Sequence, residues 1–244
     1  MNSKKQHLID VFIDTENRVN NGEYNKDLKC VLKIFDKTLV KDPLFKVTNA
    51  NGSITVKNID CIEAARQLSL KGKTCMLNMA SYKKPGGGVR SGAMAQEEEL
   101  SRCSNLVFGL NPHFYPLGLN SYLYTENVTF FKDRYYQIVD SFDCDIITIA
   151  AVNLNHNIGT KEYHDLTDEK IKSMIYEPYL HGCHNLVLSA FGCGVFRNDP
   201  EYISIVFDRY VPLMKSLYDN VVFAILNDHN SVANNYSIFE KNLG

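Results

Sequence analysis

The sequence predicts an α/β protein in which helices pack against a central, largely parallel β-sheet. Continuous apolar runs of strand length recur along the chain, and segments with helical periodicity separate them. Strands buried on both faces of a parallel sheet have this composition, and a helix usually forms the crossover between them. Glycine-rich segments follow two of the runs, at the strand ends where such sheets bind ligands. The runs are TCMLNMA (74–80), DIITIAAVNL (145–154), NLVLSAF (185–191) and NVVFAIL (220–226).

The composition is that of a globular protein without a strong charge bias. The 244 residues are 45% hydrophobic and 22% charged, and the formal net charge is −2. This balance argues against a protein that binds nucleic acid through its phosphates. No apolar run is long enough for a membrane span, and the N-terminus lacks the apolar core of a signal peptide. We therefore expect an intracellular protein, cytoplasmic or nuclear, without membrane or direct nucleic-acid partners.

The cysteines predict neither a disulfide framework nor a zinc site. Seven are scattered along the chain, and none forms a CxxC pair. Their number is odd and their spacing irregular, which is typical of small apolar residues in a reducing compartment. We expect no metal and no cofactor.

The first third of the chain predicts two helices and a short strand. Residues 6–20 place apolar side chains on one helical face, and NGEY ends that helix. SITVKN (53–58) alternates as a strand does. The segment 59–72 offers Asp60 as an N-cap and Gly72 as a stop signal.

The middle of the chain predicts one long helix and a pair of strands. Residues 93–110 read as a single helix that ends at Asn111-Pro112. NVTFFKD (127–133) and YYQIVD (135–140) read as strands, antiparallel because their link is short. The run 145–154 is expected to be a separate strand.

Prolines predict helix breaks in the C-terminal third of the chain. Residues 167–180 predict a helix interrupted near Pro178, and residues 200–217 predict a helix that Pro212 kinks or splits. Beyond 226 we expect an irregular polar tail. No linker or repeat divides the sequence, so we expect a single domain over 1–244.

Three consecutive glycines lie between the strand 74–80 and the helix that follows it. Gly86, Gly87 and Gly88 allow positive φ and close approach of a ligand to the backbone. Helix N-termini also favour anions. The alternative is a tight strand-to-helix connection without a ligand. A Walker-type phosphate loop is excluded because no Gly-Lys-Ser/Thr follows.

Three glutamates open the helix after the glycines. The apolar stripe of this helix predicts that Gln96 and Glu97 flank the core, while Glu98 points away from the stripe. Glu98 and Glu99 then face water or a cleft. The alternative is a solvated acidic first turn, which the helix dipole favours.

A glycine triplet, seven residues and Gln-Glu-Glu resemble the signature of the microbial-type poly(ADP-ribose) glycohydrolases. SITVKNIDCIEAARQL, YPLGLNSYLYTENVTFFKD, LSAFGCGVFRNDP and VVFAIL resemble other family segments, so the likeness spans most of the chain. The resemblance implies a macrodomain-like three-layer α/β/α sandwich with a mixed, largely parallel sheet and an N-terminal helical extension over 1–25. It also implies a hydrolase that acts on poly(ADP-ribose), binds ADP-ribose as product and needs no metal.

The resemblance also implies roles for individual residues. Glu98 is the catalytic acid, and Glu97 holds the ribose beside the scissile bond. Glu99 lies outside the pattern and is taken as a surface residue. Asn78 bonds ribose hydroxyls, or caps a turn. The other predicted substrate-binding residues are Gly86, Gly87, Gly88, Val89, Gln96, Gly192, Cys193, Gly194, Val195 and Phe196.

Some of these residues have plainer interpretations. Phe196 fits a core residue as well as a ribose contact, and Cys193 fits a small spacer between two glycines better than a nucleophile. For the chemistry, Glu98 has to enter protonated, a state that burial, a neighbouring carboxylate and a bound diphosphate all favour. A water near the diphosphate is then the nucleophile.

Three other functions remain open from the sequence. They are a reader that binds ADP-ribose without cleaving it, a hydrolase for single ADP-ribose units on proteins or nucleic acid, and a degenerate homologue. The intact Gln-Glu-Glu argues against the reader. Exo and endo cleavage are not distinguished.

Overall fold

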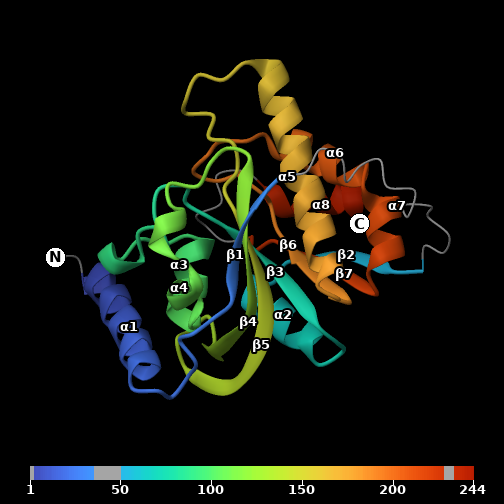
Figure 1. Cartoon of the computed structure of the whole chain (residues 1–244). Coiled ribbons are helices and arrows are strands. Elements are labelled where there is room, and N and C mark those ends of the chain that lie inside the picture. Colours follow the sequence, from blue (N-terminus) through green and yellow to red (C-terminus); the bar gives the residue numbers. More distant parts are fainter. Residues whose placement is uncertain (1–2, 36–50, 228–233) are drawn as a thin grey trace. The chain divides into compact units, whose positions relative to one another are not determined.

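The computed structural model describes residues 3–35, 51–227 and 234–244 (Figure 1). The chain divides into two compact units. Unit 1 comprises Met1–Lys33 and Asn78–Ala150, and unit 2 comprises Ile34–Leu77 and Ala151–Gly244. Within the described residues, no helix is both long and apolar enough to cross a membrane.

The strands form a seven-stranded mixed sheet in the order β1-β4-β5-β3-β6-β7-β2. In unit 2, β7 pairs in parallel with β2 and with β6, and β3 pairs in parallel with β6. In unit 1, β4 and β5 are antiparallel. The predicted α/β class with a mixed, largely parallel sheet is confirmed. The strands are β1 (Cys30–Ile34), β2 (Ser53–Lys57), β3 (Thr74–Met79), β4 (Ser121–Lys132), β5 (Ile138–Ile149), β6 (Asn185–Leu188) and β7 (Asn220–Ala224).

Unit 1 contains the N-terminal helix and the glutamate-bearing helix. Helix α1 buries Leu8, Phe12, Thr15 and Val19, spaced three or four residues apart on one face. It contacts α3 and the 3-10 turn η3, and Figure 1 shows it in blue beside the green helices. The helices of this unit are α1 (Ser3–Asn20), η3 (Val89–Ser91), α3 (Gln96–Cys103), α4 (Leu106–Gly109) and η4 (Pro112–Phe114).

The single helix predicted over 93–110 is wrong. Helix α3 ends at Cys103, because Ser104 adopts extended geometry and forms a β-bridge with Phe130. Asn105 reinforces this break: its side-chain oxygen accepts the Thr129 N–H at 2.8 Å. Pairing with β4 thus overrides the local helical pattern.

Two further sequence expectations in unit 1 need correction. The strands predicted at 135–140 and 145–154 are one continuous strand, β5, which runs from Ile138 to Ile149. The strand predicted at 127–133 is the second half of β4, which begins at Ser121. The edge strand β1 was not predicted.

Unit 2 confirms several local signals. The Asp60 carboxylate caps α2 by accepting the Glu63 N–H at 2.9 Å. The helix predicted over 200–217 is split into α6 and α7, and Pro212 lies in the first turn of α7, where its missing N–H is tolerated. The helices of this unit are α2 (Cys61–Ser69), α5 (Thr160–Leu180), α6 (Pro200–Asp208), α7 (Val211–Leu217) and α8 (Asn235–Leu243).

Two expectations in unit 2 are wrong. Helix α5 begins at Thr160 and continues past Pro178 without interruption, because the proline lies in the last turn. The polar tail ends in helix α8, which buries Phe239 and Leu243. Phe239 lies 6.0 Å from the ring of Phe223 and 6.4 Å from that of Phe207, so a few apolar residues suffice to dock this helix.

Candidate active site

The first turn of α3 is tied to backbone N–H groups by three successive side chains. Gln96 Oε1 accepts the Met79 N–H at 2.7 Å, and Glu97 Oε2 accepts the Ser81 N–H at 2.6 Å. Met79 is the last residue of β3, and Ser81 lies two residues beyond it. These bonds tether the start of α3 to the segment at the end of β3; they do not cap the N–H groups of the helix itself, and Ala95 makes no side-chain cap.

The third of these side chains reaches the glycine triplet. Glu98 Oε1 accepts the Gly88 N–H at 2.8 Å. The other carboxylate oxygen, Oε2, is buried and has no hydrogen-bond partner among the described residues. Glu98 is therefore fixed through one oxygen while the second remains available.

Both catalytic candidates are buried. Glu97 is 2% exposed and Glu98 is 7% exposed. The position of Glu97 next to the core is confirmed, and the alternative of a solvated acidic first turn is wrong for these two residues. Glu99, taken as a surface residue, is half-buried, and its Oε1 accepts the Tyr136 hydroxyl at 2.9 Å.

Burial raises the pKa of Glu97 to about 8. The Ser81 N–H opposes this rise by stabilising the carboxylate, and the neighbouring Glu98 charge adds to it. Glu97 therefore holds a proton at neutral pH and is a potential hydrogen-bond donor.

The three glycines of the triplet lie where a Cβ would clash with neighbouring side chains. Gly86 and Gly87 have φ of +66° and +55°. A Cβ on Gly87 would lie 2.4 Å from Glu98 Oε1 and 2.8 Å from Glu97 Oε2. A Cβ on Gly88 would lie 2.7 Å from the Ala93 Cβ. Both the backbone conformation and the close approach require the absence of a side chain.

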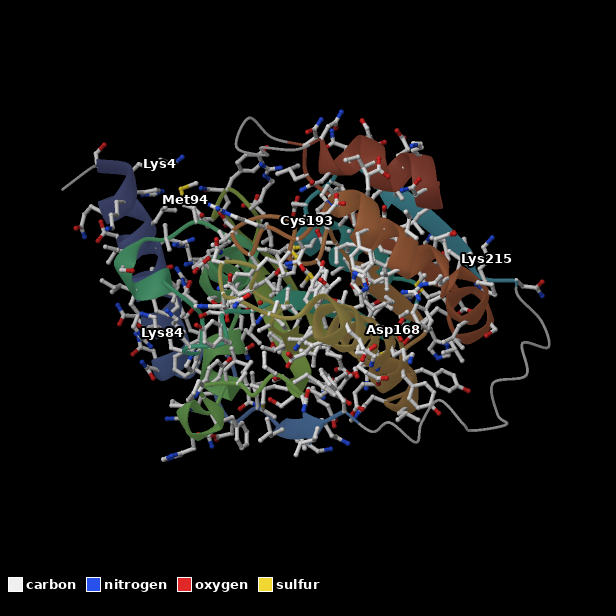
Figure 2. The ribbon with its side chains drawn as sticks, turned by 90° about the horizontal axis from the view of Figure 1, so that it is seen from above. Lys4, Lys84, Met94, Asp168, Cys193 and Lys215 are labelled. Atoms are coloured by element: carbon white, nitrogen blue, oxygen red, sulfur yellow. The ribbon has the colours of Figure 1, made fainter. Side chains whose placement is uncertain are left out.

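The N–H groups of this loop are bonded within unit 1. Gly87 donates to the Lys84 carbonyl at 3.2 Å, Gly88 donates to Glu98, and Val89 donates to the Gly86 carbonyl at 3.1 Å. Donation to a diphosphate would require these bonds to be exchanged, and that role of the loop stays a prediction. In Figure 2, Lys84 and Met94 mark the chain on either side of the triplet.

Asn78 is fully buried near the end of β3. Its amide nitrogen donates to the Thr148 hydroxyl at 3.2 Å, so its side chain bonds to a neighbouring strand and not to a turn. The amide oxygen has no hydrogen-bond partner within the described part of the chain. Its predicted contact with a ribose hydroxyl is not tested by this geometry.

The second predicted loop lies in unit 2, where Cys193 marks it in Figure 2. Gly192 has φ of +76°, and a Cβ there would lie 2.6 Å from the Asn198 amide nitrogen. Gly194 and Val195 are exposed, Val195 at 77%. Phe196 is half-buried, which leaves both interpretations of it open.

Cys193 fits the spacer interpretation. Burial raises the pKa of its thiol to about 12, so the nucleophilic thiolate is not formed at neutral pH. Its half-buried side chain lies between two glycines, as the sequence indicates.

Sequence reasoning missed two buried polar residues that shape these loops. Asn198 donates from its amide nitrogen to the carbonyls of Val152 at 2.8 Å and Gly192 at 3.1 Å, closing the second loop. Arg102, on α3, is fully buried and donates to the carbonyl of Ala93 beyond the first loop. The only sequence signal for Arg102 was a charged residue between two apolar stripe positions.

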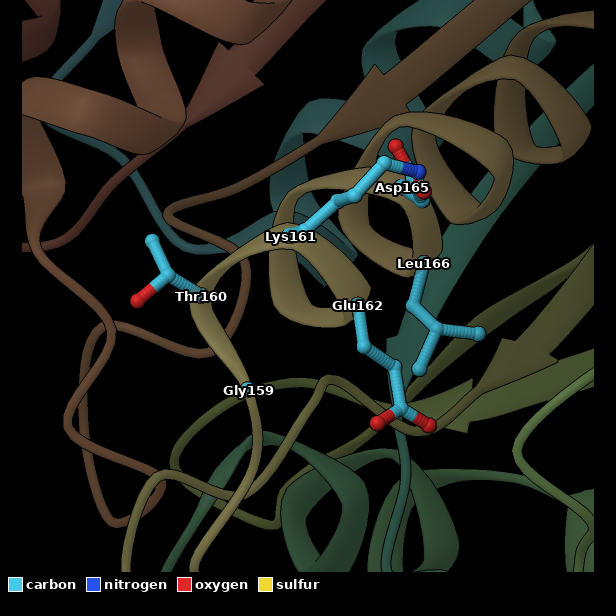
Figure 3. A pocket seen from close by; sticks show the side chains of 6 residues that line it. All are labelled: Gly159, Thr160, Lys161, Glu162, Asp165 and Leu166. Atoms are coloured by element: carbon cyan, nitrogen blue, oxygen red, sulfur yellow. Dashed lines mark hydrogen bonds and ion pairs between the residues drawn. The ribbon is translucent and has the colours of Figure 1, made fainter.

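A hollow of about 580 Å³ lies at the N-terminus of α5 (Figure 3). Lys161 and Asp165 form an ion pair of 2.9 Å beside it. None of the predicted site residues lines this hollow. Its lining is Gly159, Thr160, Lys161, Glu162, Asp165 and Leu166.

Comparison with known proteins gives a family match and several structural matches. The family described as microbial-type PARG, catalytic domain, matches residues 13–133. The crystal structure of poly(ADP-ribose) glycohydrolase from Thermomonospora curvata is 24% identical, with a TM-score of 0.85 over 98% of this chain and 100% of that chain. Its complex with the inhibitor ADP-HPD is also 24% identical, with a TM-score of 0.82 over 97% and 99%.

A third structure comes from another organism. Poly(ADP-ribose) glycohydrolase from Deinococcus radiodurans in complex with ADP-ribose is 26% identical, with a TM-score of 0.74 over 87% of this chain and 93% of that chain. No curated protein matches. The family match contains the glycine triplet and Gln96–Glu98, and the likeness of fold extends over nearly the whole chain. The chain is therefore similar to the microbial-type poly(ADP-ribose) glycohydrolases, in sequence over residues 13–133 and in fold over nearly its whole length.

Proposed function

We propose that this protein hydrolyses the ribose–ribose O-glycosidic bonds of poly(ADP-ribose) and releases ADP-ribose, with Glu98 as general acid and base. The family match and the ADP-ribose and ADP-HPD complexes of its relatives support the substrate. The geometry of Glu98 supports its role. Gly88 holds one carboxylate oxygen, and the other is buried without a hydrogen-bond partner among the described residues.

The proposed reaction passes through an oxocarbenium-like state. Glu98 gives its proton to the leaving ribose oxygen as the bond from that oxygen to the anomeric carbon breaks. A water then attacks the anomeric carbon and returns a proton to Glu98. The products are two hydroxyl groups, and the acid is regenerated.

Glu97 acts as a neutral neighbour in this proposal. Its pKa of about 8 keeps it protonated at neutral pH, so it can donate a hydrogen bond to a ribose oxygen. A protonated Glu97 also spares Glu98 an adjacent negative charge. A neutral Glu97 also adds no negative charge that would repel the diphosphate of the substrate.

The remaining assignments come from the family resemblance. Asn78 contacts the ribose, Gly86–Val89 surround the distal ribose and diphosphate, and Gly192–Phe196 bind the diphosphate. Gln96 supports them by holding the Met79 N–H. The free cysteines fit the expected cytoplasmic or nuclear location. We also propose that both units act as one catalytic domain, with 1–25 as its helical extension.

Substitution of Glu98 by glutamine tests the proposal. Glu98→Gln retains an acceptor for the Gly88 N–H but cannot supply a proton, so we expect normal folding, retained binding of ADP-ribose and a loss of hydrolysis of about 10²–10⁴-fold. Calorimetry measures binding, and release of ADP-ribose from polymer measures hydrolysis.

Glu99→Gln is the matched control. It lies one residue further along α3, and glutamine can still accept the Tyr136 hydroxyl, so its rate should stay near that of the wild type. A wild-type rate in Glu98→Gln would exclude the proposed role. Release from a protein carrying single ADP-ribose units, but not from polymer, would favour the mono-ADP-ribosyl hydrolase instead.

A further inference from the structure

Two buried cations lie where α1 packs on the rest of unit 1. Arg102 is 0% exposed and Lys132 is 2% exposed. A buried cation requires acceptors, because leaving water is unfavourable for a charge. Lys132 Nζ donates to Thr15 Oγ1 at 2.7 Å, to the Val11 carbonyl at 3.1 Å, and lies 2.7 Å from Asp14 Oδ2. All of these groups belong to α1.

Arg102 differs from Lys132 because it bonds two segments at once. Its Nε donates to the Leu8 carbonyl of α1 at 3.2 Å, and one terminal nitrogen donates to the carbonyl of Ala93. Its own carbonyl accepts the Thr15 hydroxyl at 2.5 Å. The planar guanidinium thus joins α1 to the segment between the glycine triplet and α3.

Ala93 links this guanidinium to the glycine loop. The Ala93 N–H donates to the Gly88 carbonyl at 3.1 Å, and the Gly88 N–H donates to Glu98 Oε1 at 2.8 Å. Each step in this series is a single hydrogen bond between neighbouring peptides or side chains. It runs from Leu8 through Arg102, Ala93 and Gly88 to the Glu98 carboxyl.

Helix α1 also supports the loop directly. Gly92 has φ of +71°, and a Cβ there would lie 2.6 Å from the Lys5 carbonyl oxygen of α1. Arg90 of η3 forms a 2.5 Å ion pair with Glu16 and lies over the Phe12 ring at 5.0 Å. The loop is therefore packed closely against α1 and bonded to it.

We infer that Arg102 is a positioning residue that orients the Glu98 carboxyl through Ala93 and Gly88, with α1 as its fixed support. It does not touch the substrate. The catalytic consequence rests on the proposed function, but the orientation of Gly88 does not.

Arg102→Lys tests this inference. Lysine keeps the charge but presents its donors from one point, so it cannot match the two carbonyls that the guanidinium fork joins. We expect kcat on poly(ADP-ribose) to fall at least about tenfold, with KM and ADP-ribose affinity within about threefold of wild type. We also expect hydrogen exchange of the Gly88 amide, followed by NMR on the full chain, to become at least about tenfold faster.

Lys132→Met is the matched control. It removes an equally buried cation from the same helix contact but has no bond to Ala93, so stability should fall while kcat and Gly88 exchange stay near wild type. Equal changes at Gly88 in both variants would reveal a general loosening of α1 and overturn the inference.

Unchanged Gly88 exchange in Arg102→Lys would also overturn it, whatever the activity. If wild-type protein does not cleave polymer, the proposed function fails while Gly88 exchange still decides the role of Arg102. Should Arg102→Lys not fold, Thr15→Val provides a milder change. It removes the hydroxyl that donates to the Arg102 carbonyl and that also accepts from Lys132, so its effect on Gly88 exchange is compared with that of Lys132→Met. Faster Gly88 exchange in Thr15→Val than in Lys132→Met would support the inference, and equal exchange would overturn it.

Discussion

Replacing Glu97 with glutamine should remove a pH-dependent loss of stability from unit 1. The folded protein holds the Glu97 proton up to a pKa of about 8, whereas the unfolded chain releases it near 4.5. The folded state thus binds the extra proton between these values, and stability falls as pH rises from about 4.5 to 8. The contribution is fully present below this window and is lost above it. Glutamine does not titrate, and its oxygen can still accept the Ser81 N–H.

The magnitude follows from the two pKa values. A difference of about 3.5 pH units corresponds to about 5 kcal/mol at most, and to about 4 kcal/mol between pH 5 and pH 9. Urea unfolding of both proteins at these two pH values measures it. With a denaturant slope near 3 kcal/mol/M, the midpoint of Glu97→Gln relative to wild type should rise by about 1.3 M from pH 5 to pH 9.

Comparing variant with wild type isolates Glu97, because other titrating groups are common to both proteins. Glu162→Gln, at an exposed carboxylate on α5, controls for the loss of one negative charge. If Glu97→Gln and wild type showed the same change in midpoint between the two pH values, burial of a protonated Glu97 would be refuted.

Three further substitutions probe the loops and a buried lysine. Gly87→Ala should destabilise the protein by about 1–3 kcal/mol in a urea titration and abolish most hydrolysis, because the added Cβ would clash with both carboxyl groups. Gly22→Ala is the control: Gly22 also has positive φ but has open space around it. This variant should lose only about 1 kcal/mol of stability in the same titration and retain activity. Asn198→Ala should weaken ADP-ribose binding about tenfold by calorimetry, since two carbonyls that hold the second loop lose their donor, and an unchanged Kd would contradict this. Burial lowers the pKa of Lys170 to about 7, so its contribution to stability rises with pH from about 7 to 10.5. Urea unfolding at pH 7 and pH 10 should show that the free energy of unfolding of the wild type rises by about 4 kcal/mol relative to that of Lys170→Met. The same change in both proteins would contradict burial of a neutral Lys170.

Local signals in the sequence predicted those elements whose cause is local. The Asp60 cap and the split at Pro212 depend on residues within one helical turn, and both are present. The break at Ser104 was not predictable in this way, because its cause is a bridge to Phe130 in β4. Helix α8 was missed because its few apolar residues become significant only through contacts with distant elements, which are α6, β2 and Phe223 of β7.

The candidate site shows the same limit. Helical periodicity correctly placed Glu97 beside the core: it is 2% exposed and accepts the Ser81 N–H. Glu98 is buried by the glycine loop and not by that face, so periodicity alone assigned it to water or a cleft. Arg102 and Asn198 donate to carbonyls that are distant in the sequence, and no pattern in a single sequence predicts such hydrogen bonds.

The contact between α1 and the two interior cations bears on how far this chain could be shortened. In a protein that begins after Asn20, Lys132 would lack the Val11 carbonyl and the Thr15 hydroxyl as acceptors, and Arg102 would lack the Leu8 carbonyl. Arg102 would then keep only its bond to Ala93, beside an apolar surface newly exposed to water. Helix α1 is thus an integral part of unit 1. We expect a catalytic fragment without it to have lower solubility and a lower turnover number.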